Sequence, residues 1–97
     1  MIEYKIEDKE GWEIKDNEFE NVLNEIYPDY KIADTRNLSK TTMKVYGIYE
    51  NNQYLGQINA TYRQDETQII ILGHQDEIIE ISVKMNSNFV WNNRKEI

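Results

Sequence analysis

The sequence predicts an α+β fold, because one segment with the period of a helix is accompanied by several segments with the period of strands. Over residues 17–27 apolar residues recur at intervals of three and four, as in an amphipathic helix. Residues 2–7 and most of 42–86 contain alternating apolar positions, the period of a half-buried strand. We therefore expect residues 1–97 to form a single compact domain, in which an antiparallel sheet of about four to six strands packs on one helix.

The first two elements are predicted by their apolar positions and their boundaries. Ile2, Tyr4 and Ile6 alternate with charged residues and indicate a strand over 2–7. The helix begins near Asn17, whose spacing to Glu20 is typical of a capping box, and it ends before Pro28. Its apolar stripe consists of Phe19, Val22, Leu23 and Ile26.

A β-meander is predicted over residues 42–86. Asn51-Asn52 suits a two-residue hairpin turn, which would place Tyr49 opposite Tyr54, Val45 opposite Ile58 and Met43 opposite Ala60 on one inner face. Further turns near 63–67 and 74–76 would lead into a strand containing Ile69 and Ile71, and then into a fourth strand over 78–85 that pairs Ile79 with Ile71. Residues 30–34 are expected to be a short strand or an extended connection, and 35–41 a polar loop.

The second face of this predicted sheet is also apolar. It would carry Tyr46, Ile48, Leu55, Ile70, Leu72 and Ile78. Two explanations stand side by side: the face is covered by Phe89-Val90-Trp91, by Trp12-Glu13-Ile14 or by the first strand, or it is exposed as an interface. In the second case the Tyr46, Ile48, Leu55 and Ile70 face would make the protein a homodimerising interaction module.

Charge is distributed unevenly along the chain. The net charge is −7, and residues 1–27 alone hold nine acids and three lysines, a net of −6. Lysine and arginine are the residues that read phosphate backbones, and the longest basic cluster here is Arg94-Lys95. Nucleic acid is therefore disfavoured as a direct ligand, and a protein with a basic surface is favoured.

The sequence offers little support for catalysis or for a bound cofactor. It has no cysteine and one histidine, His74, which stands among turn-forming residues and makes a poor metal site by itself. Phosphate-binding and dinucleotide-binding glycine motifs are absent. We expect a protein that is not an enzyme and that needs no metal or cofactor. No apolar run is long enough to span a membrane and no signal peptide is evident, so we expect a cytoplasmic protein. Abundant isoleucine, asparagine, lysine and glutamate favour an origin in a low-GC bacterium, or in a phage or mobile element of one.

The acidic amino-terminal quarter is the candidate binding surface. Its carboxylates could imitate a row of phosphates and enter a basic nucleic-acid-binding groove, with Tyr46 as an additional contact. The candidate residues are Glu7, Asp8, Glu10, Glu13, Glu18, Glu20, Glu25 and Tyr46.

In size, acidity and lack of cysteine the chain is similar to small phage-encoded inhibitors of bacterial defence, such as anti-CRISPR and anti-restriction proteins. It is also similar to immunity proteins that neutralise basic nuclease toxins. The resemblance implies an inhibitor of a nuclease or CRISPR effector.

Overall fold

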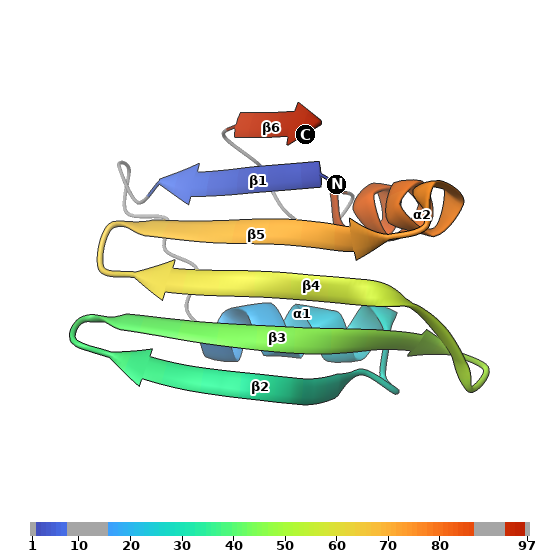
Figure 1. The fold of residues 1–97 in the computed structure, drawn as a ribbon, viewed down its shortest axis with the longest axis horizontal. Helices are drawn as coiled ribbons and strands as arrows, with labels where there is room; N and C mark the ends of the chain where they lie inside the picture. The colour runs from blue at the N-terminus through green and yellow to red at the C-terminus, as the bar shows by residue number, and fades with distance from the viewer. Residues whose placement is uncertain (1, 8–15, 87–92, 97) are drawn as a thin grey trace.

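The computed structural model describes residues 2–7, 16–86 and 93–96, and these form one sheet and two helices (Figure 1). The elements are β1 (Ile2–Glu7), α1 (Asp16–Ile26), β2 (Lys31–Leu38), β3 (Thr41–Glu50), β4 (Gln53–Arg63), β5 (Glu66–Gly73), α2 (Gln75–Asn86) and β6 (Asn93–Glu96). The strand order is β2-β3-β4-β5-β1-β6, and every neighbouring pair is antiparallel. The α+β class, the strand over 2–7 and the helix predicted over 17–27 are confirmed.

Both helices contribute to one hydrophobic core against the sheet. Phe19 and Leu23 of α1 and Ile81 and Met85 of α2 are fully buried in it, and α1 lies behind β3 and β4 in Figure 1. We call the side of the sheet that packs on the helices the inner face. Its buried residues on the strands include Ile2, Tyr46, Ile48, Ile58, Ala60, Tyr62, Thr67, Ile69 and Ile71.

The predicted fourth strand of the meander is wrong, because residues 75–86 form the helix α2. Ile78, Ile81 and Met85 are buried, whereas Ile79 is exposed, which is the helical spacing of three and four rather than the alternation of a strand. The apolar positions Ile78, Ile79 and Ile81 are too few to distinguish the two periods. The partner of Ile71 is accordingly not Ile79, but Ile58 on β4 and Ile2 on β1. The sheet therefore packs on two helices rather than one.

The loop predicted over residues 35–41 is wrong as well, because most of it belongs to β2. This strand pairs with β3 from Lys31 to Leu38, and Lys40, with a positive φ of 60°, makes the turn into β3. All eight residues of β2 are exposed. Its polar composition is therefore that of an edge strand, which sequence alone does not distinguish from a loop.

A β-bulge two residue pairs beyond the hairpin turn decides which side chains enter the core. The predicted pairing of Tyr49 with Tyr54 is confirmed, but Leu55 is then an extra residue on β4, and Ile48 pairs with Gly56. From there on Tyr46, not Val45, lies opposite Ile58. The predicted inner face is therefore right for Ile58 and Ala60 of β4, but wrong for Tyr54, which is exposed, and for Leu55, which is buried. It is wrong for β3, where Tyr46 and Ile48 are buried and Met43 is exposed.

Glycine is required where the bulge meets β5. Gly56 has a φ of +156°, and it pairs with Gly73 of β5. A Cβ on Gly56 would collide with the carbonyl oxygen of Leu72, and one on Gly73 would lie 2.9 Å from that of Leu55. These are backbone atoms, so the collision cannot be relieved by a rotamer change.

Substituting Gly56→Ala should therefore lower the free energy of unfolding by about 1–3 kcal/mol, the usual cost of a disfavoured backbone conformation. Urea denaturation measures the change. Gly47→Ala is the matched control, because its Cβ would lie 3.1 Å from the movable ring of Tyr49. We expect a loss below about 1 kcal/mol there. Equal losses in the two variants would contradict the proposed role of the bulge.

A tyrosine pair lies at the centre of the core, under α1. The hydroxyl groups of Tyr46 and Tyr62 are 2.8 Å apart and share a hydrogen bond, and the ring of Phe19 packs against both. Burial raises the pKa of both tyrosines well above its ordinary value of 10.0. Burial also raises the pKa of Tyr27 to about 12. The folded state therefore favours the neutral phenols.

The raised pKa values predict a loss of stability in alkaline solution. Below pH 10.0 the phenols are neutral in the folded and the unfolded chain, whereas above it the unfolded chain releases protons that the folded chain retains. The urea midpoint should therefore fall as the pH rises from about 10 to about 12. The double variant Tyr46→Phe/Tyr62→Phe removes two of these groups, so its midpoint should fall less steeply over the same range. A parallel fall in the variant would refute this explanation.

Candidate protein-binding surface

The structure distributes the predicted acidic site over several environments. Glu18 and Glu25 are exposed on α1, as the hypothesis requires. Glu7 ends β1 opposite Glu66 of β5. Asp8, Glu10 and Glu13, together with the proposed covering segments 12–14 and 89–91, lie outside the described residues.

Glu20 is held by an internal ion pair. Lys44 of β3 reaches from the inner face of the sheet to α1, where its Nζ lies 3.2 Å from Glu20 Oε1 and 3.1 Å from Asp16 Oδ2. The side chains of Lys44 and Glu20 are only 14% and 17% exposed. Burial by itself lowers the pKa of Lys44, but the hydrogen bonds to Asp16 and Glu20 outweigh it and raise that pKa. Glu20 therefore joins α1 to the sheet and contributes little net charge to the surface.

The solvent side of α1 carries a sparse acidic stripe. Glu18, Asn21 and Glu25 are exposed at positions i, i+3 and i+7, so they fall on one side of the helix. At the standard rise, Glu18 and Glu25 are about 10 Å apart along the axis. Neither carboxylate has an ion-pair partner among the described residues.

The solvent side of α2 combines acids with exposed aliphatic side chains. The sequence had predicted a strand for this segment. Ile79 and Val83 are 47% and 64% exposed and lie one turn apart. Asp76 and Glu80 lie on the same side of the helix, and Lys84 binds Glu80 at 3.0 Å and Glu50 at 3.2 Å. Asp76 and Glu77 in the first turn and Lys84 in the last are a helix signal that the sequence did contain.

Together α1 and α2 form an acidic layer on one side of the sheet. The two helices hold seven acids, Asp16, Glu18, Glu20, Glu25, Asp76, Glu77 and Glu80, and one basic residue, Lys84. We call the exposed part of this layer the helical surface, and define it by Glu18 and Glu25 on α1 and by Asp76, Ile79, Glu80 and Val83 on α2. The acidity is thus not confined to the amino-terminal quarter of the chain.

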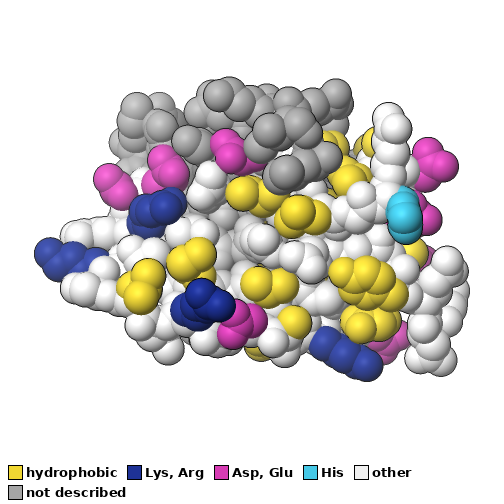
Figure 2. Space-filling view, viewed as in Figure 1, with side chains coloured by type: hydrophobic (Ala, Val, Ile, Leu, Met, Phe, Trp, Pro, Cys, Tyr) yellow, Lys and Arg dark blue, Asp and Glu magenta, His cyan; other side chains and the backbone are white. Residues whose placement is uncertain are grey.

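The predicted contact at Tyr46 is wrong, because Tyr46 is fully buried beneath α1. Ile48 and Leu55, also assigned to a homodimer face, belong to the same core. Ile70 lies on the outer side of the sheet instead, since its partners Asn59 and Glu3 alternate with the inner residues. Figure 2 shows that outer side, where hydrophobic and charged side chains are interspersed. The proposed face does not exist as one surface, because the bulge divides its members between the two sides.

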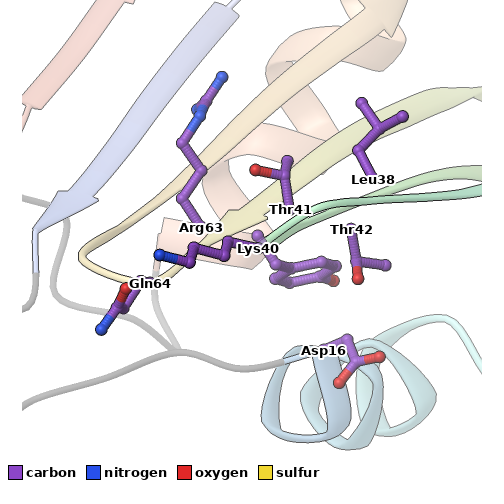
Figure 3. Close-up of a pocket in the computed structure, with 8 residues that line it drawn as sticks. Asp16, Leu38, Lys40, Thr41, Thr42, Arg63 and Gln64 are labelled. Carbon is purple, nitrogen blue, oxygen red and sulfur yellow. The ribbon is translucent and has the colours of Figure 1, made fainter.

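A polar cleft of about 430 Å³ opens between the β2–β3 turn, the β4–β5 turn and the start of α1. Its charged residues are Asp16, Lys40 and Arg63, and Figure 3 shows the Lys40 and Arg63 side chains diverging, with Asp16 across the cleft on α1. The described part of the chain has no cluster of three metal-binding side chains. His74 is exposed and its carbonyl oxygen accepts the first hydrogen bond of α2, from Ile78. The charged side chains of the cleft therefore do not point toward a common position where a reacting atom could lie.

Comparison with models of known protein families, with curated proteins and with solved structures gives no significant match. Among the described residues, neither helix has the length and apolarity needed to cross a membrane.

Replacing Lys44 with methionine tests the link between α1 and the sheet. Lys44→Met should lower the free energy of unfolding by about 1–3 kcal/mol, because it leaves the half-buried Glu20 carboxylate without its charged partner. Lys40→Met, at an exposed turn, is the control and should change stability by less than about 0.5 kcal/mol. Chemical denaturation at neutral pH compares them, and equal stability of the two variants would show that the ion pair contributes nothing.

Proposed function

We propose that this protein is a non-enzymatic acidic inhibitor that docks its helical surface on the basic, nucleic-acid-binding surface of a partner protein. The observation that carries the proposal is the charge of the helical layer: the two helices hold seven acids, and two lysines, Lys44 from β3 and Lys84 on α2, bind three of them. A layer of this sign is attracted to basic proteins and speeds the encounter with them at low salt. An acidic surface of this kind fits a partner whose basic surface binds phosphates, such as a nuclease or a CRISPR effector.

The apolar pair on α2 favours a protein partner of this kind over general electrostatic attraction. Protein interfaces have a desolvated apolar centre surrounded by polar groups. Ile79 and Val83, with Asp76 and Glu80 beside them, supply both parts on one helix. Burying the two aliphatic side chains adds affinity that salt does not screen.

The spacing of the acids on α1 limits how closely the helical surface imitates nucleic acid. Two exposed carboxylates about 10 Å apart give a lower charge density than a DNA strand, which carries one phosphate per about 3.4 Å of axis. We infer that binding depends on charge and apolar contact together, rather than on a phosphate-like row alone. An immunity protein against a basic nuclease toxin would use the same chemistry, and the identity of the partner separates it from a phage-encoded inhibitor of defence.

The test is affinity capture from a lysate of a low-GC bacterium, with quantitative mass spectrometry of the retained proteins. Two variants address the two parts of the surface: Glu18→Lys/Glu25→Lys reverses its charge, and Ile79→Ser/Val83→Ser removes its apolar pair. The control is Asp65→Lys/Glu66→Lys, which makes the same change in net charge at the β4–β5 turn, outside the helical surface. All six positions are at least partly exposed, so each variant should fold.

We expect the wild-type protein and the control to retain the same basic nucleic-acid-binding protein. Each helical variant should retain at least about tenfold less of it, corresponding to a loss of about 1.4 kcal/mol. Retention by the wild type should fall as salt rises from about 50 to about 200 mM, because charge contributes to the attraction. Undiminished capture by the charge-reversed variant would refute the proposal.

A further inference from the structure

β2 is an open edge of the sheet. It is the first strand in the order β2-β3-β4-β5-β1-β6, so among the described strands only β3 pairs with it. All eight of its residues are exposed, including Ile32 at 49% and Leu38 at 61%. An exposed edge of this length presents unpaired backbone N–H and C=O groups that can add a further strand.

The charges on β2 alternate so that the strand complements itself. Asp34 and Arg36 are two residues apart on the outer side of the sheet, where their partners on β3 are Val45 and Met43. Within one chain they form an ion pair of 3.1 Å, with exposed fractions of 73% for Arg36 and 50% for Asp34. At this exposure the pair is worth little to the monomer, so its two groups can exchange partners with a neighbouring strand. Asp34 Oδ1 also accepts a hydrogen bond from the backbone N–H of Thr35 at 2.9 Å, a local contact that a neighbouring strand would replace.

We propose that β2 pairs with β2 of a second copy, antiparallel and centred on Thr35, to join two sheets into one. In an antiparallel pair, residues directly opposite each other lie on the same side of the sheet. Two identical strands related by a twofold axis meet this condition when one residue lies opposite its own copy, and that residue is the centre of the pairing. Centring on Asp34 sets two aspartates opposite each other, and centring on Arg36 sets two arginines opposite each other. Centring on Thr35 sets Asp34 opposite Arg36 twice and pairs the two threonines, so favourable cross-strand pairs replace like-charge contacts.

Ala33 limits how far this pairing extends. The register between β2 and β3 shifts between Ile32 and Asp34, which makes Ala33 a bulge near one end of the strand. The regular stretch therefore begins at Asp34, and the central charges, rather than the ends of β2, select the register. The proposed contact is at the edge of the sheet, away from the helical surface, so it is independent of the proposed function.

The test is sedimentation equilibrium of the whole chain between about 10 μM and about 1 mM, because edge-strand contacts are small and associate weakly. We expect the wild type to approach twice the monomer mass of 11.7 kDa. Arg36→Asp gives a strand with two acids and Asp34→Arg a strand with two bases, so each alone should remain a monomer. The swapped variant Asp34→Arg/Arg36→Asp restores opposite charges in the same register and should dimerise as the wild type does.

Mixing the two single variants provides the matched control. The two acids of the Arg36→Asp strand would face the two bases of the Asp34→Arg strand, so the mixture should form a heterodimer although neither component self-associates. Urea denaturation of each variant checks that folding is unchanged. A wild type that stays monomeric at about 1 mM would leave the edge to a strand of another protein and overturn the proposal. Dimerisation of Arg36→Asp alone would overturn it too, because the contact would then lie elsewhere.

Discussion

The extra residue at Leu55 is the constraint on which the rest of the structure depends. Side chains alternate between the two sides of a strand, so one inserted residue on β4 changes which residues of β3 lie opposite the inner residues of β4. Tyr46 and Ile48 thereby enter the core, and Lys44 comes to face α1. The close approach of Gly56 and Gly73 accommodates the bulge, since neither position has room for a Cβ.

The position of Lys44 connects this backbone feature to the charge distribution. On the opposite side of the sheet its ammonium group would lie far from α1, and Asp16 and Glu20 would remain as uncompensated acids at a helix that covers the core. On the inner face it holds both carboxylates, while Phe19 of the same helix packs against Tyr46 and Tyr62. On α1 the acids that remain exposed are Glu18 and Glu25, which no described lysine or arginine binds.

The fold separates two surfaces with different chemistry. The helical surface is acidic with a small apolar centre at Ile79 and Val83, which suits a basic protein partner. The β2 edge offers backbone groups and balanced charge at Asp34 and Arg36, which suits a copy of itself. If both are used, one dimer presents two helical surfaces to a partner, and binding at the second is favoured by its proximity to the first.

The sequence by itself determined the α+β class, the first strand, α1, the hairpin at Asn51-Asn52 and the two middle strands, because each has a clear local period or turn signal. It also determined that acids dominate α1. Only the tertiary structure decided the face of β3, the helical state of residues 75–86 and the strand state of Thr35–Leu38. A bulge has no reliable local signal, and the apolar positions Ile78, Ile79 and Ile81 fit both a helix and a strand. An exposed edge strand has the composition of a loop. For these segments, packing against neighbours far along the chain selected the structure.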